Sequence, residues 1–120
     1  MKFIIERAAL LKSLGHVQSV VERRNTIPIL SNVRIEAGDG QLSLNATDMD
    51  LDIIDQGTAN VSQPGATTAP AHTLYEIVRK LPEGSEVEFE SNNDGQLELK
   101  SGRSRFNLTC LPTDDFPVMA

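Results

Sequence analysis

A four-residue sequence, Asp-Gly-Gln-Leu, occurs twice in this chain, at 39–42 and at 94–97. The apolar residues around it recur at the same spacing of 55 positions, and the polar positions between them recur with different charges. An internal repeat of this kind indicates one structural unit used twice, and two copies are too few for a solenoid. The repeat therefore favours a domain with internal pseudo-two-fold symmetry. The apolar matches are Leu42 with Leu97, Leu44 with Leu99, Leu51 with Phe106 and Ile53 with Leu108, and the polar matches set Asp48, Asp50 and Asp52 against Arg103, Arg105 and Asn107.

The two halves repeat one order of predicted elements: a strand, a helix and three more strands. In the first half an apolar strand over 1–5 leads into apolar residues at helical spacing, which predict a helical segment over 6–24. In the second half a helix is predicted over 71–81, because Pro82 and Gly84 end it. The two Asp-Gly pairs favour tight hairpin turns. The remaining strands are expected over 32–36, 41–45, 48–55, 66–69 and 86–90, and in a hairpin over 94–110.

Helices with one apolar face and strands with one apolar face must cover each other. We therefore expect an α+β fold in which two helices pack on one face of eight mainly antiparallel strands. The last strand of each half, 48–54 and 103–110, has no sequence neighbour on its outer side. These two strands are expected to be exposed sheet edges, which are a liability unless they pair with something.

At 120 residues the chain is expected to be one domain with a real core. Charged residues interrupt the apolar residues over 1–14, unlike in a signal peptide, and no apolar run is long enough to span a bilayer. One cysteine, Cys110, cannot form an internal disulfide, which agrees with a reducing compartment. We expect Cys110 to pack in the core, and the protein to be cytoplasmic with no membrane partner.

The net charge of −6 is unevenly distributed. The two predicted helical segments, 6–24 and 71–81, hold six basic and three acidic residues, which gives +3, and the rest of the chain carries −9. Basic helices on an acidic β scaffold would attract polyanions to one face and repel them elsewhere. The alternative is that these cations are ordinary solvated residues of helix surfaces.

Three carboxylates at alternate positions, Asp48, Asp50 and Asp52, suggest a metal site. On a strand they would share a face but lie about 7 Å apart, and the glycine and distal glutamate of an EF-hand loop are absent. A solvated strand face is the preferred interpretation. His16 and His72 lack the neighbours that would make a catalytic triad. We therefore expect no active site, no metal and no cofactor.

Two arginine pairs have a possible binding role. Arg23 and Arg24 follow the first predicted helix in a polar stretch, where they would suit phosphate contacts or simply be solvated. Arg103 and Arg105 would lie on the wet face of an edge strand whose other face carries Phe106 and Leu108. Arginine and aromatic residues are favoured in protein interfaces, so this strand is either an interface or an ordinary amphipathic strand.

Several stretches spread from end to end of the chain closely resemble bacterial DNA polymerase III β subunits, the sliding clamps. The most specific are SGRSRF at 101–106 and LPTDDFP at 111–117. The others are MKFIIERAALLKSL at 1–14, IPIL at 27–30, LSLNATDMDLDI at 42–53, PGATTAPA at 64–71 and LPEG at 81–84.

This resemblance implies the DNA-clamp fold and a first domain of three, with residues 1–120 forming that domain and 111–120 beginning the interdomain linker. Two subunits of such a protein close head to tail into a ring whose helices line the central hole. The ring encircles duplex DNA, contacts its backbone without reading sequence, and tethers the replicative polymerase; it is not an enzyme. DNA polymerase III and the clamp loader would bind domains outside this chain.

The resemblance also implies roles for individual residues. Arg24, with Arg23 beside it, matches a DNA-contacting loop, and Arg79 matches a basic position on the second helix. His72 is assigned to DNA contact, and the resemblance implies that the strand 103–108 closes the ring with Tyr75 beside it. The residues expected at the subunit interface are Arg103, Arg105, Phe106, Leu108, Tyr75 and Thr73.

Two other functions stay open from the residues alone. The chain could be a self-associating module that uses its two β edges and has no nucleic-acid role. It could also be a metal-dependent enzyme built on the three aspartates at 48, 50 and 52.

Overall fold

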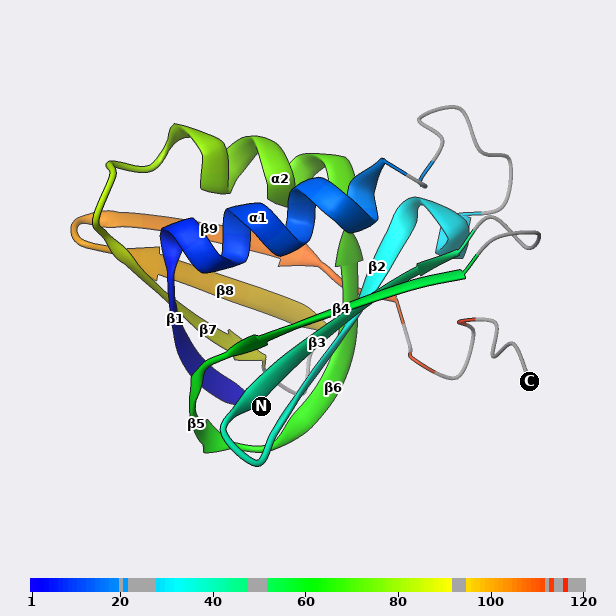
Figure 1. Cartoon of the computed structure of the whole chain (residues 1–120), viewed down its shortest axis with the longest axis horizontal. Coiled ribbons are helices and arrows are strands. Elements are labelled where there is room, and N and C mark those ends of the chain that lie inside the picture. Colours follow the sequence, from blue (N-terminus) through cyan, green and yellow to red (C-terminus); the bar gives the residue numbers. More distant parts are fainter. Residues whose placement is uncertain are drawn as a thin grey trace.

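Two helices lie side by side over two antiparallel sheets in the computed structural model (Figure 1). The structure describes residues 1–19, 21, 28–47, 52–91, 95–111, 113 and 116. The elements are β1 (Lys2–Glu6), α1 (Arg7–Gln18), the 3-10 turn η1 (Pro28–Ser31), β2 (Asn32–Gly38), β3 (Gln41–Thr47), β4 (Asp52–Thr58), β5 (Asn60–Gln63), β6 (Gly65–Pro70), α2 (Ala71–Lys80), β7 (Glu86–Ser91), β8 (Gln96–Ser101) and β9 (Ser104–Thr109).

The predicted α+β fold is confirmed, with one strand more than expected among the described residues. The additional strand is β5, which continues the line of β4 past Ala59 and pairs with β1. It carries no strict apolar alternation, so the sequence pattern did not predict it.

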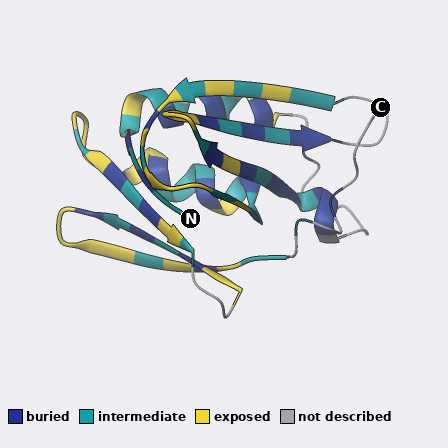
Figure 2. Cartoon of the chain, turned by 90° about the horizontal axis from the view of Figure 1, so that it is seen from below, coloured by how far each residue is buried: buried dark blue, intermediate teal, exposed yellow. Residues whose placement is uncertain are grey.

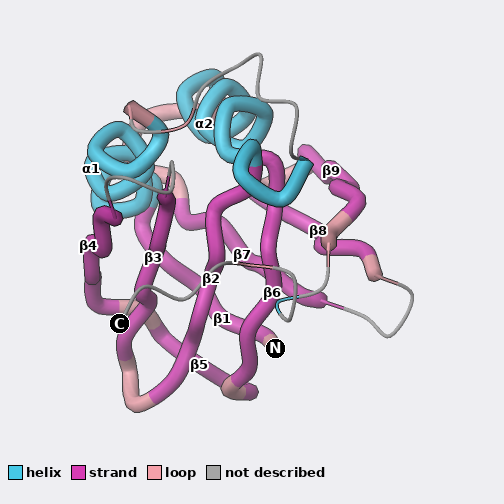
Figure 3. Tube along the Cα trace, turned by 90° about the vertical axis from the view of Figure 1, so that its right-hand side faces the viewer, coloured by secondary structure: helices cyan, strands magenta, loops and turns pink. Residues whose placement is uncertain are grey.

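The strands form a five-stranded sheet, β5-β1-β7-β8-β9, and a four-stranded sheet, β4-β3-β2-β6. The first strand of each half pairs with a strand of the other half: β1 pairs with β7, and β6 pairs with β2. This exchange places the two helices that follow β1 and β6 next to each other on one side of the sheets (Figure 3). Neither half can complete its sheet alone.

The helix predicted over 6–24 is too long. α1 ends at Gln18, and the Ser19 hydroxyl donates a 2.7 Å hydrogen bond to the carbonyl of His16. Serine hydroxyls compete in this way with helix propagation. α2 matches its prediction closely: it ends at Lys80, and Leu81 turns to an extended conformation, as the residue before a proline prefers.

The apolar faces of both sheets point toward the helices and form one main core. Buried and exposed residues alternate along the strands, as Figure 2 shows. At the centre of the five-stranded sheet the rings of Phe3 and Phe89 stack with their centroids 4.7 Å apart. Cys110 packs against this core as predicted, and burial raises the pKa of its thiol.

The two halves do repeat in structure, but their last strands do not match at the spacing of 55 positions. Gly40 and Gly95 have the same left-handed backbone, with φ of 73° and 74°, and their carbonyls accept the amides of Ala59 and Cys110. However, 19 positions separate Gly40 from Ala59 and only 15 separate Gly95 from Cys110. Asp55, opposite Leu44, is therefore the counterpart of Phe106, opposite Leu99. The predicted matches of Leu51 and Ile53 with Phe106 and Leu108 are wrong, because the first hairpin is four residues longer.

The two expected edges are confirmed as the outer strands β4 and β9. β4 lies at Asp52–Thr58, later than the predicted 48–54, and positions 48–51 are outside the described residues. The other two outer strands are β5 and β6.

A small cluster of hydrogen bonds around Thr68 holds the chain at Leu111, just after β9. The buried Thr68 hydroxyl accepts hydrogen bonds from Asn32 Nδ2 at 3.0 Å and the Leu111 amide at 3.2 Å, and donates to the Leu111 carbonyl at 2.7 Å. Next to it, Phe116 packs on Ile29 and Leu30 of η1 in a second apolar cluster.

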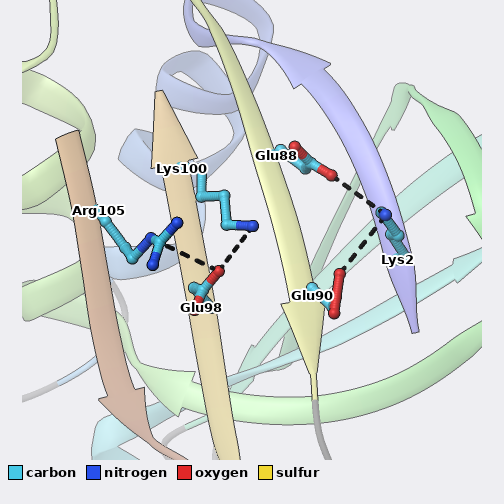
Figure 4. Close-up of polar contacts among 6 residues, drawn as sticks. All are labelled: Lys2, Glu88, Glu90, Glu98, Lys100 and Arg105. Carbon is cyan, nitrogen blue, oxygen red and sulfur yellow. Dashed lines mark ion pairs between the residues drawn. The ribbon is translucent and has the colours of Figure 1, made fainter. Parts of the chain in front are cut away.

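The face of the five-stranded sheet opposite the helices carries paired charges (Figure 4). The Lys2 ammonium lies 3.5 Å from a Glu88 oxygen and 3.6 Å from a Glu90 oxygen. One oxygen of Glu98 lies 3.0 Å from Lys100 Nζ and 3.9 Å from Arg105 Nε. The hydrogen bond from Lys100 is the main reason why the pKa of Glu98 is lowered. Cations and carboxylates are equal in number in this set, so this outer face is largely self-neutralised.

The stacked Phe3–Phe89 pair should carry a large share of the stability. Replacing Phe89 by alanine removes a fully buried ring and leaves a cavity, which should lower the free energy of unfolding by about 3–5 kcal/mol. Urea unfolding followed by circular dichroism measures this change. Ile54→Ala is the control, since Ile54 is 58% exposed, and should cost less than about 1 kcal/mol. A similar small loss for Phe89→Ala would contradict this description of the core.

The lowered pKa of Glu98 predicts a pH dependence of definite sign. A carboxyl whose pKa is lower in the folded chain stabilises the fold above its ordinary pKa, and this contribution disappears as pH falls through the lowered value. In Lys100→Met the pKa of Glu98 should rise toward its ordinary value, as measured by NMR titration of the side-chain carboxyl. Lys2→Met, which removes a cation from the same face, should leave that titration unchanged. An equal midpoint in wild type and Lys100→Met would show that Lys100 is not the cause.

Candidate nucleic-acid and subunit interfaces

The two helices run antiparallel and are tied together at both ends. The guanidinium of Arg7, in the first turn of α1, donates to the carbonyls of Val78 at 3.1 Å and Arg79 at 2.9 Å. These carbonyls belong to the last turn of α2, where a cation also complements the helix dipole. At the other end His72 Nε2 donates to the Val21 carbonyl at 2.7 Å. The helix pair therefore forms one surface with a fixed arrangement.

This helix surface is basic, while the rest of the chain is acidic. α1 and α2 together hold four Lys and Arg and one Glu, which is +3 of the total −6. The side chains of Lys12 and Lys80 are exposed and form no ion pair among the described residues. Arg7 contributes charge, but two of the five N–H donors of its guanidinium bond to the α2 carbonyls and hold it in place. The cations available to a ligand are thus fewer than the sequence count suggests.

Arg79 lies on this surface, as predicted, with its side chain 54% exposed. Its Nη2 is 3.0 Å from Glu76 Oε2, and its guanidinium carbon is 6.0 Å from the centre of the Tyr75 ring. These exposed contacts are weak, so Arg79 can turn toward a phosphate at low cost.

The structure does not place the other predicted DNA contacts, Arg23, Arg24 and His72, on the exposed helix surface as it does Arg79. Arg23 and Arg24 lie outside the described residues. His72 lies in the first turn of α2, but its Nε2 is engaged by Val21 and its Nδ1 is buried without a partner. To contact DNA through Nε2, His72 would have to break its hydrogen bond with the Val21 carbonyl. A role of His72 in DNA binding stays a prediction.

The residues predicted for the subunit interface are divided between two sides of β9. Arg105 is exposed on the charged outer face, and Arg103 lies in the turn before the strand. Phe106 points the other way, toward α2, and Leu108 is only 9% exposed within the main core. Leu108 therefore supports the strand from inside, and Phe106 is the apolar residue of β9 that a partner could reach.

A groove with a volume of about 660 Å³ lies between α2 and β9. Thr73, Glu76, Ile77 and Lys80 line it from α2, and Phe106 lines it from β9. This places Thr73 next to the predicted interface strand. The groove combines an apolar floor with a few polar groups, as docking sites for side chains do.

Tyr75 does not lie beside β9, so that part of the prediction is wrong. It is about 200° around α2 from Thr73, because successive helical residues are separated by about 100°. Its ring packs toward α1, where a Cβ added at Gly15 would be 3.8 Å from Tyr75 Cε1. Tyr75 thus belongs to the contact between the two helices.

Within the described ranges, no three His, Cys, Asp or Glu side chains gather as metal ligands. Asp48 and Asp50 of the proposed carboxylate site lie outside those ranges. In the described part of the chain, no helix combines the length and the apolar character needed to cross a membrane.

Sequence reasoning missed the roles of Arg7 and Thr68. Both act on backbone carbonyls or amides that are more than 40 positions away in the chain. No local pattern of residue types signals such a contact. These contacts depend on the packing of α1 against α2 and of β6 near β9.

The chain matches known proteins over its whole length. The family model for the DNA polymerase III beta subunit, N-terminal domain, matches residues 1–120. The beta sliding clamp of Caulobacter vibrioides is 64% identical over 121 residues, which cover 100% of this chain and 32% of the relative. The beta sliding clamp of Escherichia coli strain K12 is 42% identical over 118 residues, which cover 98% of this chain and 32% of the relative.

Solved structures agree with these matches. A crystal structure of the DNA polymerase sliding clamp from Caulobacter crescentus superposes with a TM-score of 0.97 at 64% identity, covering all of this chain and 33% of that one. A sliding clamp from Bartonella birtlesii bound to griselimycin gives a TM-score of 0.95 at 48% identity, covering all of this chain and 32% of that one. The chain spans about a third of the length of these relatives. It belongs to the DNA polymerase III beta subunit family, the bacterial sliding clamps, and corresponds to their N-terminal domain.

Proposed function

We propose that this chain is the first of three domains of a DNA-replication processivity factor, a ring that encircles duplex DNA and tethers the replicative polymerase. The observation that carries the proposal is the division of charge: +3 on the helix pair and −9 on the remainder of the chain. Family membership supports it. A ring lined by such helices would attract DNA into its hole and repel it from its outside.

The type of contact on the helix surface suits sliding. Lys12, Arg79 and Lys80 are exposed cations on long side chains, and such side chains suit contacts to phosphate, which carry no sequence information. Weak backbone contacts let a protein move along a duplex. In this proposal the ring closure, and not the affinity, holds the protein on DNA.

The proposed DNA contacts are Arg24, with Arg23 beside it, and Arg79, with His72 at the other end of α2. The proposed ring closure uses the β9 edge and the groove beside α2, through Arg103, Arg105, Phe106 and Thr73. Leu108 supports this strand from the core, and Tyr75 supports α2 from the helix contact. The partner at this edge would be the third domain of a second subunit.

The remaining parts of the proposal follow from the two thirds of the relatives that this chain does not cover. DNA polymerase III and the clamp loader would bind there, so this domain alone should not capture their binding peptides. The protein would act as a homodimer in the cytoplasm and catalyse no reaction.

The test of topological binding uses the three-domain chain that carries this domain. It is loaded on nicked circular DNA by its clamp loader, and the circle is then cut. The protein should remain on circles and leave linear DNA through the ends. The 120-residue chain alone, which cannot close a ring, should be retained on neither. Equal retention of the three-domain chain on circular and linear DNA would refute the ring.

A substitution on α2 tests whether DNA contacts the helix surface or the outer faces of the sheets. Arg79→Gln should weaken backbone association and reduce the slope of log affinity against log salt by about 1 for each subunit. Arg34→Gln is the matched control, because Arg34 forms a similar exposed ion pair on a β strand, with Glu36. Equal effects of the two substitutions would contradict a DNA-facing helix pair.

The β9 edge predicts a second effect, on subunit association. In the three-domain chain, Phe106→Ala should raise the subunit dissociation constant about 10- to 100-fold, because it removes the apolar residue of the groove. Asn107→Ala, at the next position and exposed on the opposite face, should have a small effect. Analytical ultracentrifugation measures both. If Phe106→Ala leaves association unchanged, the groove is not part of the interface.

A further inference from the structure

We infer that His16 is a proton-dependent DNA contact: its imidazole, held by Asp55, binds a backbone phosphate only when both ring nitrogens carry hydrogen. The inference rests on the proposed function, in which α1 and α2 face DNA. It deepens that function by adding a contact whose strength depends on pH. The charge of +3 on the helix pair does not include this contact, because histidine is counted there as neutral.

His16 lies on the side of α1 that faces away from the core. The exposed residues of α1, which are Ala8, Lys12 and His16, are spaced four positions apart. Residues at this spacing share one face of a helix, with Cβ atoms of neighbours about 5–6 Å apart. The side chain of His16 is 57% exposed. It can therefore reach the same stretch of DNA backbone as Lys12.

Asp55 of β4 holds the imidazole from one side. Its Oδ2 lies 2.7 Å from His16 Nδ1, and its Oδ1 accepts the Gln56 amide at 2.9 Å. Asp55 is on the α1 side of β4, as is Gly57 two positions later, where an added Cβ would be 3.9 Å from Ser13 Oγ. Because both carboxylate oxygens are engaged, the ring is fixed in one orientation.

This hydrogen bond determines which ring nitrogen can meet a ligand. A carboxylate only accepts hydrogen bonds, so Nδ1 of His16 carries a hydrogen and donates it. In the neutral ring Nε2 is then an acceptor, which a phosphate oxygen repels. A proton from the solvent turns Nε2 into a donor, and charge-assisted bonds to phosphate are strong. Nε2 has no hydrogen-bond partner among the described residues. A phosphate therefore binds the protonated ring preferentially, and DNA binding takes up a proton.

Few charged groups surround His16 in the described part of the chain. On β4, Asp55 faces α1, whereas Asp52 lies on the opposite face of the strand. On α1, Lys12 is one turn away. β1 and β3 turn apolar residues toward the helices, and α2 meets this part of α1 through Tyr75. A phosphate would thus meet one permanent cation, Lys12, and one histidine whose charge depends on pH.

The other histidine of the chain is unsuited to this role. His72 Nε2 donates to the Val21 carbonyl, and its Nδ1 is buried without a partner. A proton added to His72 would place a charge on that buried nitrogen, which is unfavourable. The pH dependence of DNA contact is therefore assigned to His16.

The test measures association of the 120-residue chain with a short DNA duplex by NMR titration, at about pH 8 and about pH 6, the range in which histidine changes charge. From the higher to the lower pH, the affinity of the wild type should rise about 3- to 10-fold more than that of His16→Gln. At about pH 6 the slope of log affinity against log salt should be steeper for the wild type by about 1, and at about pH 8 the two slopes should agree. This slope counts phosphate contacts, so a merely structural role of His16 would not change it.

Two features make the substitutions specific. The glutamine in His16→Gln can still donate to Asp55 but never gains a charge. The double variant His16→Gln, Asn107→His has as many histidines as the wild type, but its new histidine is on the exposed outer face of β9. This double variant should behave like His16→Gln at both pH values. If it regains the pH dependence of the wild type, total charge is the cause and the inference is wrong.

Equal salt slopes of the wild type and His16→Gln at about pH 6 would also overturn the inference. So would a duplex that leaves the Nε2 resonance of His16 unchanged, or a wild type with no measurable association at about pH 6 in low salt. The proposed function is tested separately. Arg79→Gln should weaken association at both pH values, because arginine keeps its charge, and retention of the three-domain chain on circular DNA does not require His16.

Discussion

The exchange of first strands between the two halves determines how this domain is assembled. β1 completes the sheet of the second half by pairing with β7, and β6 completes the sheet of the first half by pairing with β2. Because a helix follows each exchanged strand, the exchange brings α1 and α2 together, antiparallel, over one shared core. It also leaves β4 and β9, the last strands of the main hairpins, as outer edges. The helix surface and the two edges are therefore consequences of one pairing pattern.

The charges follow this architecture. Cations on the outer face of the five-stranded sheet lie next to carboxylates and are largely neutralised, whereas Lys12 and Lys80 on the helices have no ion pair among the described residues. Arg7 has a different use, since it holds the end of α2 through two carbonyls. A count of helical cations therefore overestimates the side chains that are free to turn toward a polyanion, but the helix surface is basic, as predicted. This contrast between two faces supports the proposed DNA-facing side better than the net charge of −6 could.

Much of the fold could be predicted because the repeat, the alternating strands and the Asp-Gly turns are local patterns with strong physical causes. The failures came from interactions that local patterns do not contain. α1 ends at Gln18, where the Ser19 hydroxyl bonds to a helix carbonyl, and the match of the last strands fails because one hairpin is four residues longer. For the site, the surface positions of Arg79 and Arg105 could be predicted from the sequence. The neighbours of Tyr75 and His72 could not, because they depend on how the helices are rotated against each other.

In the proposed ring, the helix pair faces DNA and the sheets face outward. This orientation can be measured by attaching an iron chelate, which cleaves nearby DNA through hydroxyl radicals, to single introduced cysteines in the three-domain chain, after Cys110 and every other native cysteine of that chain are replaced by serine. Lys12→Cys places the chelate on α1, and Glu90→Cys places it on the exposed outer face of β7. After loading on circular DNA, cleavage is expected from position 12 and not from position 90. Cleavage from position 90 without cleavage from position 12 would show that the domain is oriented the other way.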